Sequence, residues 1–335
     1  MGSGTYSAAA YTSGVGARAA KGQSFAYDRT VRTTGNYKAH DLVDPKKLNS
    51  AGKNVREAFD NDDHPETLPI VVGFDATGSM AGTPRIVQTK LANLFGLLVR
   101  KGYTGDAYPQ IAVADYGDAK TDYVPLQISQ FEADNRVDEA LDSLFLEGNG
   151  GGNGGESAAL LWYYLNNHVE TDAWKKRNKK GYFFMIADEI THNVTAAQVE
   201  AYVGDSVSGD TNLTYEALAK QLQEKWEVFV LLVDNSTAHW QGSKKFYGDL
   251  FGEKNVIILE NDETVAETIG AVIGKLENDD LDEDELLEDL AANSNQALAA
   301  KTVKAVAHLG ARGTNVNVAK SNIATAEDVD DSVKL

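Results

Sequence analysis

Six short apolar segments alternate with segments of helical periodicity, and this alternation limits the possible folds more than any other feature. The expected strands are LPIVVGF (68–74), QIAVADYGD (110–118), TDYVPLQI (121–128), GYFFMIADE (181–189), WEVFVLLVD (226–234) and NVIILE (255–260). Continuous apolar runs are typical of parallel strands covered on both faces by helices. We therefore expect an α/β fold: a doubly wound, mostly parallel six-stranded sheet with helices on both faces. Pro125 favours an edge position for its strand, which we expect to be antiparallel.

The segments between these strands have helical periodicity. Thr83 and Pro84 suit the N-cap and first position of a helix that continues to about Arg100. Further helices are expected over residues 134–146, 156–169, 214–225 and 263–276. Helices that alternate with strands in this way indicate a sheet built from crossover connections.

The chain is expected to have three parts. Residues 1–66 are rich in Gly, Ala, Ser and Thr and predict an extended, irregular N-terminal arm. Residues 67–277 form the α/β domain. Residues 278–335 form an acidic and helical C-terminal extension, in which we expect a helix over 295–309 and an irregular tail from Gly310.

The charge distribution limits the classes of partner. The formal net charge is −19, and residues 277–289 hold nine acids and no base. Such a body repels phosphate backbones, so we expect no nucleic-acid partner. Residues 1–60 carry nine Lys or Arg against five acids, so self-assembly through oppositely charged arms is conceivable.

Two absences bear on the compartment. The sequence has no run of 18 apolar residues and no recognisable secretory signal, so we expect no membrane partner. It also contains no cysteine, and a reducing interior is the simplest environment for such a chain. We expect a cytoplasmic protein, or a virion protein if the chain is phage-encoded.

The stretch VVGFDATGSM (71–80) ends an apolar strand in three oxygen-bearing side chains, Asp75, Thr77 and Ser79. Two-residue spacing in a tight loop turns these side chains toward one point. Asp188, at the end of GYFFMIADE, adds a second carboxylate from a neighbouring strand. Ligand sets made only of oxygen suit Mg²⁺, or Mn²⁺ or Ca²⁺, rather than zinc or copper.

These residues carry a resemblance to the von Willebrand factor A (vWA) domain, whose metal-ion-dependent adhesion site has the pattern D-x-S-x-S followed by a threonine and an aspartate from two further loops. Here DATGS (75–79) and Asp188 match the first and last loops. The middle loop, GNGGGNGGES (148–157), lacks the threonine and resembles that of a bacterial and phage branch. On that alignment Asn153 and Glu156 are additional candidate ligands, although Glu156 can equally cap the following helix.

The resemblance implies a non-enzymatic module that binds a partner protein by accepting its carboxylate on the metal. Trp240 and His192, expected in polar loops near the same rim, are candidate contacts for that partner. A second interpretation is a structural component of a phage or bacterial assembly that is held by its terminal arms. A third is a phosphatase of the haloacid dehalogenase type with Asp75 as nucleophile, but Thr77 stands where that class needs its second aspartate.

Overall fold

The computed structural model describes residues 4–75, 77–80, 82–148, 154–209, 213–234, 239–260 and 262–310. For Ser79, Ala92, His239, Trp240 and Asn293 it describes the backbone alone. Asn153, in the middle of the glycine-rich loop, and the tail 311–335 lie outside this part of the chain.

A six-stranded sheet of order β4-β3-β2-β6-β7-β8 forms the centre of the molecule. All neighbouring strands pair in parallel except β3 and β4, which are antiparallel. This confirms a mixed α/β fold with a mostly parallel sheet and an antiparallel edge strand. The strands are β2 (Thr67–Asp75), β3 (Tyr108–Tyr116), β4 (Leu126–Ile128), β6 (Gly181–Ala187), β7 (Trp226–Val233) and β8 (Val256–Leu259). Short β1 (Arg56–Ala58) and β5 (Val169–Thr171) form a separate parallel pair.

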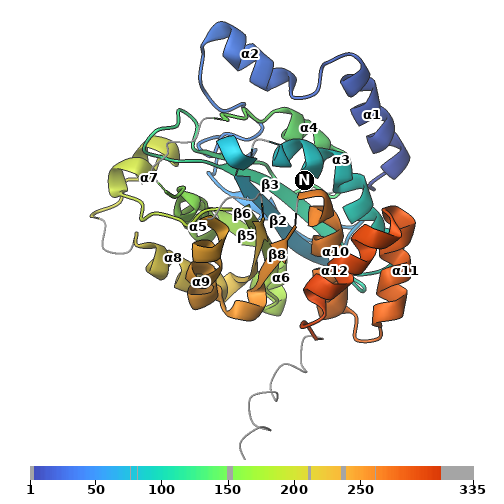
Figure 1. Cartoon of the computed structure of the whole chain (residues 1–335). Helices are drawn as coiled ribbons and strands as arrows, with labels where there is room; N and C mark the ends of the chain where they lie inside the picture. Colours follow the sequence, from blue (N-terminus) through green and yellow to red (C-terminus); the bar gives the residue numbers. More distant parts are fainter. Residues whose placement is uncertain are drawn as a thin grey trace, which may run out of the picture.

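Helices lie on both faces of the sheet (Figure 1), and each face is covered by an apolar core. Along β2, Ile70, Val72 and Phe74 face one core, whereas Val71 faces the other, because successive side chains of a strand point to opposite faces. The first core holds side chains from α1, α3, α10, α11 and α12, and the second holds side chains from α5, α7, α8 and α9. The sheet therefore has helices on both faces, and its central strands are buried along their whole length.

The helices of the α/β part are α3 (Thr83–Phe95), α4 (Arg136–Asp142), α5 (Ala158–Asn167), α6 (Asp172–Arg177), α7 (Ala196–Tyr202), α8 (Tyr215–Lys225), α9 (His239–Phe251) and α10 (Val265–Glu277). A π-helix, η2 (Gly96–Arg100), continues α3, and 3-10 turns occur at η1 (Gly78–Met80), η3 (Glu253–Asn255) and η4 (Asp262–Thr264). Threonine hydroxyls cap the N-termini of several of these helices. For example, the Thr214 hydroxyl accepts the N–H of Ala217 at the start of α8. At α3, Thr83 is the first helical residue rather than the cap, and its hydroxyl donates to Asp262 over 3.1 Å.

The N-terminal segment differs from the predicted irregular arm. It contains α1 (Ala8–Ala20), which packs against α3 (Figure 1), and α2 (Ala26–Thr34), whose Val31 forms a small apolar cluster with Val124 and Phe145. Tyr11 is buried and its hydroxyl donates to the carbonyl of Gln88 over 2.7 Å, and Phe25 is buried in the same core. Long-range side-chain contacts order a segment whose own periodicity is weak, because helices in proteins owe most of their stability to packing.

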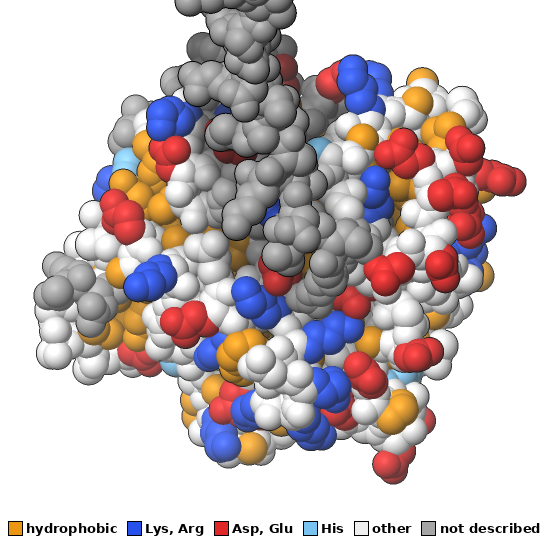
Figure 2. All heavy atoms as spheres, turned by 90° about the horizontal axis from the view of Figure 1, so that it is seen from below, with side chains coloured by type: hydrophobic (Ala, Val, Ile, Leu, Met, Phe, Trp, Pro, Cys, Tyr) orange, Lys and Arg blue, Asp and Glu red, His pale blue; other side chains and the backbone are white. Residues whose placement is uncertain are grey.

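The C-terminal extension contains two helices, α11 (Glu283–Asn293) and α12 (Gln296–Val306). Leu286 and Leu290 of α11 and Val306 of α12 belong to the same core as α3 and α10. Acidic side chains gather on the side of the molecule where α11 and α12 lie, at the right of Figure 2. The extension therefore packs Leu286 and Leu290 inward and leaves most of its acids in solvent, whereas Asp289 is buried and accepts the Tyr103 hydroxyl over 3.1 Å.

None of the helices in the described ranges combines the length and the apolar character that crossing a bilayer requires.

Docking of the N-terminal segment predicts different effects for two tyrosine substitutions. Tyr11→Ala removes a buried ring and its hydrogen bond, so we expect faster amide exchange across α1 and a free energy of unfolding lower by about 2–4 kcal/mol. Tyr37→Ala is the matched control, because Tyr37 is 43% exposed. Equal exchange rates in α1 for the two variants, measured by mass spectrometry, would contradict the docking.

Candidate metal centre

The ends of β2 and β6 lie side by side, which places two of the predicted ligands next to each other. Phe74 of β2 pairs with Ile186 of β6, so Asp75 at the end of β2 lies close to Asp188, which follows β6 directly. The strand order also reverses here, because β3 lies on one side of β2 and β6 on the other. In open parallel sheets, ligands bind outside the carboxyl ends of the strands at such a reversal.

Asp75 is buried and its loop turns tightly around it. Its side chain is 1% exposed, and its Oδ1 accepts the backbone N–H of Thr77 over 2.6 Å. The N–H of Met80 then donates to the Thr77 carbonyl over 2.8 Å, which forms the turn η1. These two hydrogen bonds fix the Asp75 carboxylate against the backbone of Thr77. Ser79 lies in η1, but its side chain is outside the described part of the structure.

Burial shifts the titration of Asp75. Removal from water raises the pKa of this carboxyl to about 7, hydrogen bonds from Thr77 oppose the shift, and the charges of Asp188 and Glu189 add to it. Asp75 therefore shares a low-dielectric space with other carboxylates, which repel one another when ionised.

Glu156 joins this acidic cluster from the opposite loop. Its N–H donates to the Ile190 carbonyl over 2.9 Å, and the His192 N–H donates to the Glu156 carbonyl over 2.8 Å. Burial raises the pKa of Glu156 to about 9, with further contributions from Asp75, Asp122 and Asp118. Its Oε2 is buried and has no hydrogen-bond partner in the described part of the chain. Glu156 therefore lies near Asp75, and its backbone is held in a bridge between two loops.

The loop after β3 contributes acids that the sequence interpretation did not select as ligands. The N–H of Asp118 donates to Asp122 Oδ2 over 2.7 Å, and the Ser157 hydroxyl donates to Asp118 Oδ1 over 3.3 Å. Burial raises the pKa of Asp122 to about 6. Gly117 is required here, because a β-carbon at this position would lie 2.3 Å from Asp122 Oδ2. Its acid-rich sequence, DYGDAKTD (115–122), is the signal from which these residues could have been selected.

The remaining predicted residues have different outcomes. His192 is partly buried, and a β-carbon at Gly155 would lie 3.1 Å from its ring, so His192 packs beside the loop that carries Glu156. Trp240 was expected in a polar loop, but its backbone belongs to α9; the helix extends to Phe251 and packs against β7 and β8. The Trp240 side chain and the whole of Asn153 lie outside the part of the chain that the structure describes.

A divalent cation is compatible with this donor set. Buried carboxylates that lack a counter-charge are costly, and the partnerless Oε2 of Glu156 is an oxygen donor of the kind that hard cations prefer. Within the described ranges, no three His, Cys, Asp or Glu side chains are grouped as a metal-binding cluster. The predicted set relies instead on Asp75 and Asp188 with hydroxyl oxygens, and waters would complete the shell.

No protein-family model matches the sequence, and no curated protein matches it either. Several solved structures match the chain with low identity and low TM-scores. The pilus adhesin SpaC of Lactobacillus rhamnosus GG, in its open conformation, is 11% identical with a TM-score of 0.43, over 66% of this chain and 31% of that one. Proximal thread matrix protein 1 of the mussel byssus is 15% identical with a TM-score of 0.39, over 62% and 46% of the two chains. The pilus adhesin RrgA of Streptococcus pneumoniae is 8% identical with a TM-score of 0.34, over 63% and 45%. The chain thus matches less than half the length of each of these proteins.

The raised pKa values predict that stability falls as the pH rises when a chelator is present. Asp75 and Glu156 have pKa values of about 7 and 9 in the folded chain, against ordinary values of 3.8 and 4.5. Between the ordinary and the raised pKa values, the folded state therefore binds more protons than the unfolded state. The free energy of unfolding thus decreases from pH 5 to pH 8. Each bound proton contributes a decrease of at most about 1.4 kcal/mol per pH unit.

Urea unfolding at several pH values measures this slope. Glu156→Gln, which stays neutral at every pH, is expected to flatten it, whereas Glu200→Gln, at an exposed position of α7, leaves it unchanged. An identical slope in the Glu156→Gln variant would show that this carboxyl does not hold a proton in the folded state.

Proposed function

We propose that the chain is a vWA-like binding module that holds a Mg²⁺-type cation at the carboxyl ends of β2 and β6 and uses it to bind a carboxylate of a partner protein. The observation that carries the proposal is the burial of Asp75 beside Asp188 at the reversal of strand order. An aspartate that served only to form the turn after a strand would be expected to lie in contact with water.

The chemistry of the donors supports a hard cation. Asp75, Thr77 and Asp188 would hold it, with Glu156, Asn153 and Ser79 as further predicted ligands. When bound, the cation would supply positive charge to the acidic cluster and an open position for an oxygen ligand. Hydrogen bonds within the chain fix the position of these donors. The Thr77 N–H orients the Asp75 carboxylate, and the Ser243 hydroxyl donates to the Asp188 carbonyl over 3.0 Å.

Two alternatives have less support. Assembly through the terminal arms has less support on the N-terminal side, because Tyr11 and Phe25 of that segment are buried against the chain's own body. A phosphatase with Asp75 as nucleophile would need a general acid two residues later, and Thr77 occupies that position. The binding module therefore remains the function that we propose.

Calorimetric titration of the full chain with Mg²⁺ and with Mn²⁺ tests the proposal. Asp75→Asn removes a charged ligand but keeps the size of the side chain, so we expect at least a tenfold weaker affinity, about 1.4 kcal/mol or more. Asp249→Asn, at an exposed position of α9, is the matched control and should bind like the native chain.

Unchanged cation affinity in Asp75→Asn would contradict the metal site. Hydrolysis of p-nitrophenyl phosphate by the native chain, lost in Asp75→Asn, would instead favour the phosphatase.

A further inference from the structure

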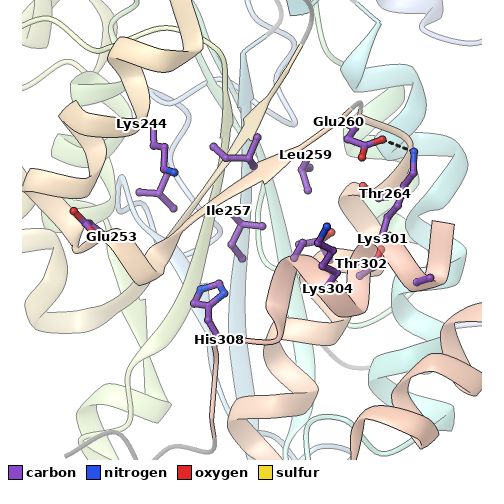
Figure 3. Close-up of a pocket in the computed structure, with 15 residues that line it drawn as sticks. Lys244, Glu253, Ile257, Leu259, Glu260, Thr264, Lys301, Thr302, Lys304 and His308 are labelled. Atoms are coloured by element: carbon purple, nitrogen blue, oxygen red, sulfur yellow. Dashed lines mark hydrogen bonds and ion pairs between the residues drawn. The ribbon is translucent and has the colours of Figure 1, made fainter. Parts of the chain in front are cut away.

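A cavity of about 640 Å³ lies along the outer edge of β8, on the side of the sheet away from the candidate metal centre. One wall comes from α9 and η3, with Lys244 and Glu253, and the other from α12, with Lys301 and Lys304 (Figure 3). Residues 256–260 line its floor. We call this cavity the β8 groove. Strand β7 separates β8 from β6, so the β8 groove is distinct from the site described above.

The floor of the β8 groove presents backbone groups that nothing in the described ranges pairs. Leu259 directs its carbonyl inward, where it accepts the Asp234 N–H over 2.7 Å. The N–H of Val256 instead donates to the Glu253 carbonyl, outside the sheet. Because successive residues of a strand direct their backbone groups to opposite sides, the N–H and C=O of Ile258 point outward, into the groove. An unpaired strand edge of this kind is a template for an added strand.

Three lysines and two glutamates line the β8 groove, so it carries a small excess of positive charge in a chain whose net charge is −19. Lys301 of α12 pairs with Glu260 at one end of the groove, and at the other end the Nε2 of His308, which follows α12, lies 2.7 Å from the Lys254 carbonyl of η3. Lys244 and Lys304 are exposed, and neither forms an ion pair with another described residue. Two acids line the groove. Glu260 pairs with Lys301, and Glu253 forms no ion pair with another described residue.

We propose that the β8 groove binds an extended, acidic peptide segment of another protein, which adds as a strand to the outer edge of β8. Ile258 supplies the backbone donor and acceptor, and Lys244 and Lys304 bind carboxylates of the peptide. Alternate side chains of an added strand point to opposite sides, so acids on both sides of the peptide reach both walls. This site goes beyond the proposed metal-dependent function and does not depend on it.

Fluorescence anisotropy with the full chain tests the proposal, with two labelled octapeptides as probes: one repeats Asp-Asp-Val-Val, which places acids on both sides of an added strand, and the other repeats Lys-Lys-Val-Val. We expect saturable binding of the acidic peptide alone, with and without a chelator of divalent cations. Ile258→Pro removes the outward N–H but leaves the pairing with β7, since proline is tolerated on the free side of an edge strand. Ile258→Val keeps that N–H and is its control.

We expect Ile258→Pro and Lys304→Glu each to weaken binding by about tenfold or more, and Ile258→Val and Lys220→Glu to leave it unchanged. Lys220 is an exposed lysine of α8 outside the groove. Lys304→Glu keeps the test decisive if Ile258→Pro does not fold. Equal binding of both peptides, no saturable binding, or binding that neither Lys304→Glu nor Ile258→Pro alters would overturn the proposal.

Discussion

The repulsion between buried carboxylates at the ends of β2 and β6 is the physical constraint on which the rest of this account depends. Parallel pairing brings the two strand ends together, and burial removes the water that would otherwise screen Asp75 from its neighbours. The surrounding structure holds these carboxylates close together and does not reduce the repulsion between them. The Tyr116 hydroxyl donates to the Ile186 carbonyl over 2.8 Å, and the Tyr247 hydroxyl donates to the Glu189 carbonyl over 2.9 Å, so tyrosines fix the backbone on both sides of Asp188. Protons or a cation must balance such a cluster, and both possibilities can be measured.

Much of the fold follows from local sequence. Strands β2, β6 and β7 are nearly continuous apolar runs, and Pro125 lies directly before the edge strand β4, so their places in the sheet were predictable. The helices α1 and α2 were not, because single side chains such as Tyr11 and Phe25 order them through contacts with residues far away in the chain. The polar residues around Trp240 predict a loop, but burial of Tyr247 and Phe251 stabilises a helix there. Long-range packing thus overrides weak local preference in these segments.

Only part of the candidate metal centre was predictable from the sequence. Asp75 and Asp188 each follow an apolar strand, so the parallel topology alone brings them together. Glu156 and Asp122 come from loops, and only the folded chain shows that they are buried in the same region and that their pKa values are raised. The groove beside β8 could not have been predicted at all, because it depends on where α12 packs relative to the edge of the sheet.

The number of protons released when Mn²⁺ binds at pH 7 tests the central claim most directly. It is obtained by calorimetry in buffers that differ in their enthalpy of ionisation. At this pH Glu156, with a pKa of about 9, holds its proton in the folded chain, and Asp75, with a pKa of about 7, is about half protonated. We therefore expect a net release of protons, which Glu156→Gln reduces. Binding of Mn²⁺ without proton release, or a release that Glu156→Gln leaves unchanged, would contradict the claim that a cation balances this buried acidic cluster.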